Sequence, residues 1–149
     1  MSMRVRSLVA TALLALAAAS AQAIEYRSVA QPAILYETPS AQGRKLFIIS
    51  EGTPVEIVVQ LERWIKVRDP AGAISWIERD KLHAQRTLMV VARPSAAVRA
   101  QPAGDADKLF EAATDVVLEL VTPPADGWVQ VRHPEGGTGH VRVTDVWGL

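Results

Sequence analysis

Residues 64–77 read WIKVRDPAGAISWI, and residues 128–141 read WVQVRHPEGGTGHV. Over the first five positions of both stretches, bulky or polar side chains alternate with Ile or Val, which is typical of a half-buried β-strand. A proline and a glycine then favour a tight turn, and a second short segment completes each stretch. Each stretch therefore predicts a β-hairpin, and the chain contains this hairpin twice.

The two hairpins belong to a longer duplication. Pro39 matches Pro102, and residues 45–47 (KLF) match residues 108–110 (KLF), both at an offset of 63. One extra residue in the turn at 122–127 raises the offset to 64 for the hairpins. Matches in this fixed order indicate two copies of one folding unit.

Each copy consists of short β-branched runs separated by turn residues, a spacing that predicts a small all-β barrel or sandwich. The expected elements are strands at 46–49, 55–59, 63–68 and 73–77, a helical turn at 80–82, and a strand at 87–91 that opens the second copy. We assign residues 24–84 to the first domain and 85–149 to the second. Because a domain of about 60 residues is marginally stable alone, we expect the two domains to pack together.

The first 23 residues have the order of a secretory signal peptide. Arg4 and Arg6 precede an apolar run at 8–19, and Ala21-Gln22-Ala23 has the small-x-small pattern of a cleavage site. The run is shorter than the roughly 20 residues that a membrane-spanning helix needs. We therefore expect cleavage after Ala23, with a cut after Ala21 or a retained anchor as alternatives. The mature protein is then periplasmic or secreted and has no transmembrane segment.

Composition excludes several classes of function. The 149 residues include 16 basic and 16 acidic side chains, and the loss of Arg4 and Arg6 with the leader leaves a net charge of −2. This balance argues against a nucleic-acid-binding protein. The chain has no cysteine, which excludes disulfides, thiolate zinc ligands, a thiol nucleophile and a lipidated cysteine anchor.

Candidate catalytic and metal-binding groups are few. The histidines are His83, His133 and His140. His133 and His140 flank the second hairpin as a candidate cross-strand metal pair, but two ligands without a third carboxylate make a poor site. Imidazoles that simply face solvent are the alternative. No Gly-x-Ser-x-Gly turn supports a serine hydrolase. We therefore predict no enzymatic activity, no metal and no cofactor.

The repeated segments resemble the bacterial SH3-like (SH3b) domain family. In that family a Trp-x-x-Val strand, a glycine-containing turn and a Gly-Trp/Tyr-Val strand follow one another. Both hairpins here follow this order, with Trp76-Ile77 and His140-Val141 in the last strand. Residues 35–40 (LYETPS) and 98–104 (VRAQPAG) resemble the family's Asn-Val-Arg-x-x-Pro stretch. Residues 51–55 (EGTPV) resemble its Leu-x-x-Gly-x-x-Val turn.

The resemblance implies an all-β fold of two tandem small SH3-like β-barrels. It also implies export to the cell envelope and a binding role, often beside peptidoglycan enzymes. Three places depart from the family pattern: Tyr36 replaces the usual arginine, Thr114-Asp115-Val116 stands where the turn glycine is usual, and His140 replaces the usual aromatic residue.

Aromatic and basic residues are the candidate ligand-binding groups. Exposed tryptophans recur at recognition sites because they add contact area at little entropic cost, although they also cap barrel ends and fill domain interfaces. Repeated arginines are candidates for contact with the carboxylates of cell-wall stem peptides or for cross-strand charge pairs. The candidate residues are Tyr36, Trp64, Arg68, Trp76, Trp128 and Arg132. Trp147, near the C-terminus, is expected to hold the chain end.

The preferred interpretation is an exported, non-enzymatic binding module that recognises cell-wall peptide or glycan, or envelope proteins. The alternative is a structural or accessory subunit that docks onto a larger envelope protein and has no cell-wall ligand of its own. The sequence does not distinguish the ligands or indicate whether both copies bind.

Overall fold

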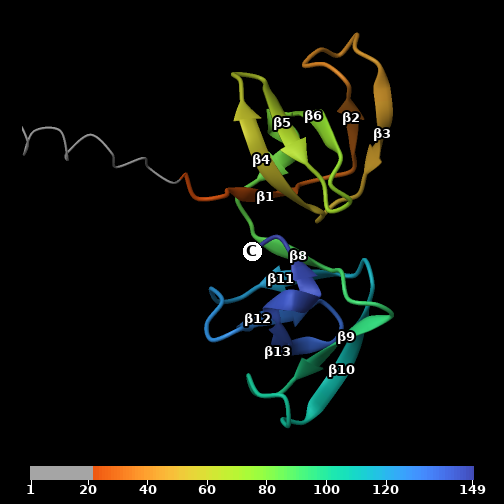
Figure 1. Ribbon diagram of the computed structural model, residues 1–149. Helices are drawn as coiled ribbons and strands as arrows, with labels where there is room; N and C mark the ends of the chain where they lie inside the picture. Colours follow the sequence, from red (N-terminus) through yellow and green to blue (C-terminus); the bar gives the residue numbers. More distant parts are fainter. Residues whose placement is uncertain (1–21) are drawn as a thin grey trace, which may run out of the picture.

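The computed structural model describes residues 22–149, so all but the last two residues of the predicted leader lie outside the described residues. The chain forms two antiparallel seven-stranded sheets, each curled into a small barrel (Figure 1). This confirms the all-β fold of two tandem SH3-like units. Within residues 22–149, no helix is long and apolar enough to cross a membrane.

The two barrels repeat the same elements in the same order. The first contains β1 (Tyr26–Val29), β2 (Ala33–Tyr36), β3 (Lys45–Ile49), β4 (Pro54–Gln60), β5 (Trp64–Arg68), β6 (Ile74–Glu78), the 3-10 helix η1 (Arg79–Lys81) and β7 (Leu82–His83). The second contains β8 (Thr87–Val90), β9 (Ser95–Arg99), β10 (Lys108–Ala113), β11 (Val117–Leu120), β12 (Trp128–His133), β13 (Gly137–Arg142), the 3-10 helix η2 (Val143–Asp145) and β14 (Val146–Trp147).

Strand pairing gives the two sheets the same order, with β3 and β7 at the ends of the first sheet and β10 and β14 at the ends of the second. The sheet orders are β3-β2-β6-β5-β4-β1-β7 and β10-β9-β13-β12-β11-β8-β14. In each barrel the last strand pairs with the first, with Ser28 opposite His83 and Val146 opposite Val90. The predicted hairpins are β5–β6 and β12–β13. The strands β1, β2, β7, β9 and β14 were not predicted, because their runs of two to five residues show no clear alternation.

Each barrel has its own aliphatic core. Ile65 and Val67 of β5 are fully buried, as are Val129 and Val131 of β12, apart from a residual 1% at Val129. The predicted alternation is therefore confirmed, and it directs the intervening side chains outward.

A turn residue with a left-handed backbone joins β3 to β4 and β10 to β11. Gly52 has φ 79°, and Asp115, its counterpart, has φ 70°. The amide of each donates to a carbonyl of its barrel's first strand, Gly52 to Val29 and Asp115 to Val90. Asp tolerates this conformation better than most side chains, so the departure from the usual glycine preserves the turn.

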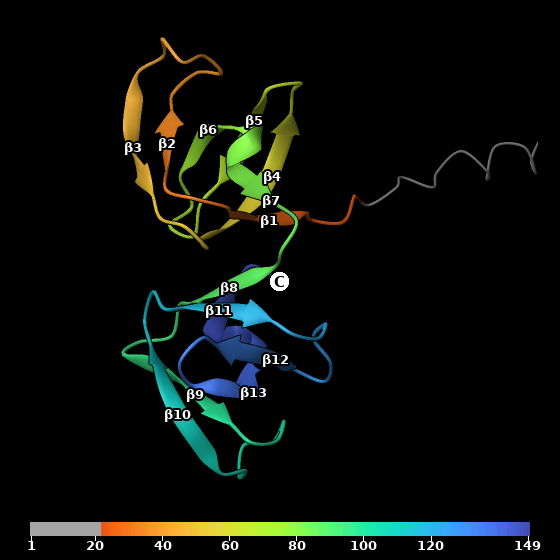
Figure 2. The same cartoon turned by 180° about the vertical axis from the view of Figure 1, so that it is seen from behind.

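The two barrels pack together through the ends of the chain, as Figures 1 and 2 show by the position of the C-terminus between them. The rings of Tyr26 and Trp147 meet edge to face at 5.1 Å. The Arg86 guanidinium lies 5.5 Å from the Tyr26 ring centroid, and Thr87 Oγ1 donates a 2.6 Å hydrogen bond to the Gly52 carbonyl. Trp147 thus joins the barrels.

The interface gives a testable pH effect at Tyr26. Burial raises the pKa of its phenol above the usual 10.0, and the nearby Glu56 carboxylate adds to the rise. The folded state therefore holds this proton more tightly than the unfolded state, and this contribution to stability is present below pH ~10 and lost as the pH rises further. In a Tyr36→Phe variant, tyrosinate absorbance reports Tyr26 alone. Its midpoint should lie above that of the same variant in denaturant; an equal or lower midpoint would contradict this.

Candidate functional site

The outer face of β2, β5 and β6 carries a cluster of aromatic side chains. Trp76 lies opposite Lys66 on β5 and opposite Tyr36 on β2. The rings of Tyr36 and Trp64 meet edge to face at 5.2 Å, and Lys66 Nζ lies 5.2 Å from the Trp76 ring centroid. The structure thus brings together three of the predicted site residues, Tyr36, Trp64 and Trp76.

A pocket of about 630 Å³, here called the Trp64 groove, opens beside this cluster. It lies between the β2–β3 loop, the β4–β5 turn and the start of η1. Its lining residues are Pro39, Ser40, Ala41, Gln42, Glu62, Arg63, Trp64, Glu78, Arg79 and Asp80. Tyr36 and Trp76 are not in the lining. Tyr36 is only 8% exposed, so it supports the Trp64 indole and does not face a ligand, contrary to the prediction.

Charges of both signs surround the indole. Glu62, Glu78 and Asp80 supply carboxylates, and Arg63 and Arg79 supply guanidiniums. Among the described residues, Glu62, Glu78 and Arg63 form no ion pair, and Asp80 has only a 4.0 Å contact with Lys81. The groove can therefore pack an apolar group on Trp64 while binding an ammonium and a carboxylate at its rim.

Arg79 holds the wall of the groove in place. Its Nε donates to the Glu62 carbonyl at 2.9 Å and its Nη2 to the Leu61 carbonyl at 2.5 Å. A longer contact of 3.4 Å joins Nη1 to Gln60 Oε1. One guanidinium thus clamps the β4–β5 turn to η1.

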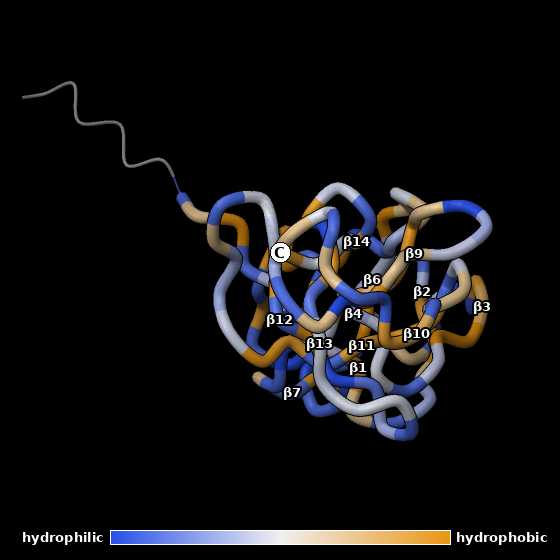
Figure 3. The backbone as a smooth tube through the Cα atoms, turned by 90° about the horizontal axis from the view of Figure 1, so that it is seen from below, coloured by the Kyte–Doolittle hydropathy of each residue, from blue (hydrophilic) through white to orange (hydrophobic). Residues whose placement is uncertain are grey.

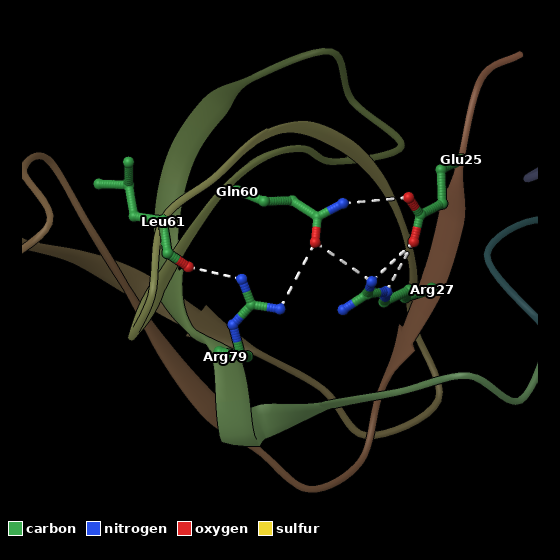
Figure 4. Close-up of polar contacts among 5 residues, drawn as sticks. All are labelled: Glu25, Arg27, Gln60, Leu61 and Arg79. Carbon is green, nitrogen blue, oxygen red and sulfur yellow. Dashed lines mark hydrogen bonds and ion pairs between the residues drawn. The ribbon is translucent and has the colours of Figure 1, made fainter. Parts of the chain in front are cut away.

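The same network reaches the N-terminal segment (Figure 4). The Gln60 amide nitrogen donates to Glu25 Oε2 at 3.1 Å, and Arg27 Nη2 donates to Gln60 Oε1 at 3.3 Å. Arg27 and Glu25 also form an ion pair at 2.8 Å. Residues just beyond the predicted cleavage site are therefore part of the support of the groove.

The opposite wall is the β2–β3 loop, whose base is closed by Glu37 and Arg44 at 2.7 Å. The hydrogen bonds and charge of Arg44 lower the pKa of the Glu37 carboxyl. Gly43 is needed here because a Cβ would lie 2.4 Å from Thr38 Oγ1 and 2.9 Å from the Ser40 carbonyl.

The second barrel presents a different surface at the equivalent tryptophan. The Arg142 guanidinium lies 4.8 Å from the centroid of the Trp128 ring. Arg142 occupies the cross-strand position of Glu78 in the first barrel. Trp128 is thus covered by a cation, whereas Trp64 borders an open groove.

The aromatic cluster is also absent from this face of the second barrel. Arg99 and His140 lie opposite each other where the first barrel pairs Tyr36 with Trp76. Arg99 donates to the Ala106 carbonyl at 2.8 Å. The positions equivalent to the aromatic cluster are therefore basic and polar in the second barrel.

Arg68 and Arg132 lie at the far ends of their strands and make cross-strand ion pairs. Arg68 Nη1 is 3.0 Å from Glu56 Oε2, and Arg132 binds both oxygens of Glu119, at 2.6 and 3.1 Å. Neither lines the Trp64 groove. The structure thus places them in the charge pairs that were the alternative interpretation.

The histidines of the second hairpin do not face each other. His133 lies opposite Gly137, and His140 lies opposite Gln130. His133 Nδ1 accepts a hydrogen bond from the Glu135 amide at 3.1 Å. Within residues 22–149, no group of three or more His, Asp or Glu side chains is placed to hold a metal ion.

A serine–histidine contact was missed by the sequence analysis. Ser28 Oγ lies 2.9 Å from His83 Nδ1 and donates a 2.6 Å hydrogen bond to the Gln85 carbonyl. Ser28 is fully buried, so the hydroxyl is closed to a substrate and instead ties β1 to the linker. The residues are 55 positions apart, and no local signal links them.

A family match that covers both barrels identifies the family of this chain. Residues 29–83 and 92–148 each match the family described as bacterial SH3 domain. The chain belongs to the bacterial SH3 domain family. Both matches lie within the two predicted domains, and the Trp64 groove lies in the first SH3 unit.

Similar solved structures include NlpC2 from Trichomonas vaginalis, with 15% identity over 86% of this chain and 49% of that chain, at a TM-score of 0.39. A further one is an NlpC/P60 family protein from Bacillus cereus, with 14% identity over 83% of this chain and 56% of that chain, at a TM-score of 0.38. The SH3 chain thus spans about half the length of these proteins, and at these scores the likeness says nothing about activity. No curated protein matches the chain.

The Arg79 clamp can be tested by hydrogen exchange. Arg79→Lys keeps the positive charge but removes the planar guanidinium that binds two carbonyls of the turn. The Leu61 amide, which donates to the Trp64 carbonyl, reports on this turn. In the variant this amide should exchange on the order of tenfold faster. Arg63→Lys is the matched control, since the Arg63 side chain makes no hydrogen bond among the described residues. Equal exchange in both variants would show that Arg79 does not hold the turn.

Proposed function

We propose that this protein is an exported, non-enzymatic binding module of the cell envelope, and that its first SH3 unit binds short peptide segments in the Trp64 groove. The observation that carries the proposal is a half-buried tryptophan beside an open pocket whose rim carries unpaired charges of both signs. Family membership supports a binding role, and the leader predicted at residues 1–23 supports export.

Cell-wall stem peptides fit the chemistry of this groove. They are short and carry carboxylate and ammonium groups close to small apolar side chains. The free carboxylates Glu62 and Glu78 suit an ammonium group, Arg63 suits a carboxylate, and the Trp64 indole suits the apolar part. Aromatic and arginine side chains supply most of the binding free energy at such sites.

The second SH3 unit has a separate role in this proposal. Arg142 covers Trp128, and the aromatic neighbours of Trp64 have no counterpart there. We therefore assign peptide binding to the first unit alone. The second unit stabilises the first through the Tyr26–Trp147 contact.

Calorimetric titration with soluble peptidoglycan fragments tests this assignment. Trp64→Ala should weaken binding by at least about 30-fold, because a central aromatic contact contributes about 2 kcal/mol or more. Trp128→Ala is the matched control in the second unit and should leave the affinity within about twofold. Arg68→Ala should likewise have no effect.

Arg63→Ala distinguishes a lost contact from a folding defect in the Trp64 variant. Arg63 is exposed on the rim, so its removal should leave the fold intact but still weaken peptide binding. Equal losses in the Trp64 and Trp128 variants would contradict the assignment to the first unit. If the fragments do not bind at all while one envelope protein co-purifies in fixed stoichiometry, the accessory-subunit alternative holds instead.

A further inference from the structure

β3 is the terminal strand of the first sheet and is unusually apolar for an exposed edge. It is drawn as the outermost strand of its barrel in Figure 1, and its path carries the hydrophobic colour at the rim of Figure 3. Ile48 is 72% exposed and Phe47 46% exposed. Edge strands leave backbone N–H and C=O groups unpaired and are usually protected against further pairing.

The second barrel shows such protection at the equivalent position. β10 is the edge strand there, and Glu111 occupies the place of Ile48 in the repeat. Glu111 binds Lys108 at 2.8 Å and accepts a 2.6 Å hydrogen bond from Ser95. A charge in the middle of an edge strand opposes strand addition. β3 has no such charge between Lys45 and Glu51.

The apolar edge continues into a cleft between the barrels. This cleft of about 460 Å³ is lined by residues 47–50 of the first barrel and by Met89, Val91 and Arg93 of the second, among others. Val91 is 40% exposed. The exposed apolar surface therefore includes both barrels.

The charges at the two ends of β3 are opposite, so two copies of this edge in antiparallel orientation have complementary charges. Residues 45–51 read KLFIISE, with Lys45 three positions before Ile48 and Glu51 three positions after it. Antiparallel pairing about a two-fold axis at Ile48 places Lys45 and Glu51 of the partner subunit at the same end of the short ladder, where their long side chains can meet. Within the described residues, neither Lys45 nor Glu51 forms an ion pair.

We infer that the protein self-associates through β3, which pairs antiparallel with β3 of a second copy about an axis at Ile48. The register shift of β3 against β2 near Leu46 ends the regular edge on one side, and the turn after Ser50 ends it on the other. Regular pairing is therefore centred on Phe47–Ile49. The short ladder predicts a weak, concentration-dependent dimer.

This dimer leaves the Trp64 groove open, since residues 45–51 are not in its lining. The inference is thus independent of the proposed ligand. Two copies would present two grooves, which would raise the avidity for a polymer that repeats its peptide.

Introduced cysteines give a direct test, because the chain has none of its own. At a two-fold axis, the two Cα atoms of residue 48 would lie about 4.5–5.5 Å apart, within the range of about 4.4–6.8 Å that a disulfide spans. Ile48→Cys should therefore form a covalent dimer on mild oxidation. Leu109→Cys, at a 50% exposed position of β10, is the matched control and should stay monomeric.

Sedimentation of the cysteine-free mature protein supplies the second test. Ile48→Glu places on β3 the same residue type that Glu111 supplies at the equivalent position of β10. This variant should abolish the dimer. Lys45→Glu should weaken it about tenfold, and Lys45→Glu with Glu51→Lys should restore it. Three results would overturn the inference. The wild-type protein could be monomeric at all concentrations, Ile48→Glu could leave the dimer unchanged, or both cysteine variants could cross-link equally. Capture of a foreign strand without self-association would also overturn it.

Discussion

The alternation of side chains along β5 is the constraint on which the first barrel depends. Ile65 and Val67 are completely buried in the core, so Trp64 and Lys66 must lie on the outer face. A shift of one residue in the pairing would expose both aliphatic residues and bury an ammonium group, whose desolvation costs several kcal/mol. The position of the Trp64 indole beside the groove is thus a consequence of core packing.

The duplication separates the requirements of the fold from those of the surface. Most inward positions of the two hairpins hold similar aliphatic residues, because both cores must be filled with apolar groups; the exception is a small residue in each, Ser75 and Gly139. Outward positions are not restricted in this way, and they differ in size and charge. The pairs that differ are Tyr36 and Arg99, Trp76 and His140, and Glu78 and Arg142. One fold therefore presents an aromatic groove in one copy and a basic face in the other.

The period-two pattern was sufficient to predict both hairpins and the outward direction of Trp64 and Trp128. It could not identify which charges meet: Arg68 and Trp64 share one face of β5, yet Arg68 pairs with Glu56, a partner set by the register of β4. The walls of the groove were also unpredictable. Gln42 and Arg79 lie in segments without periodicity, and their positions depend on how the loops fold over the barrel.

The repeat, the all-β class and the faces of the longer strands can be predicted from the sequence alone, because these depend on local alternation and on turn residues. Three further features follow only from the folded chain: which tryptophan borders a groove, which strand edge is left apolar, and how the barrels meet. Those features depend on contacts between distant residues, such as Tyr26 with Trp147 and Arg142 with Trp128. The first contact forms only when the two barrels pack together, and the second depends on the register of β12 against β13.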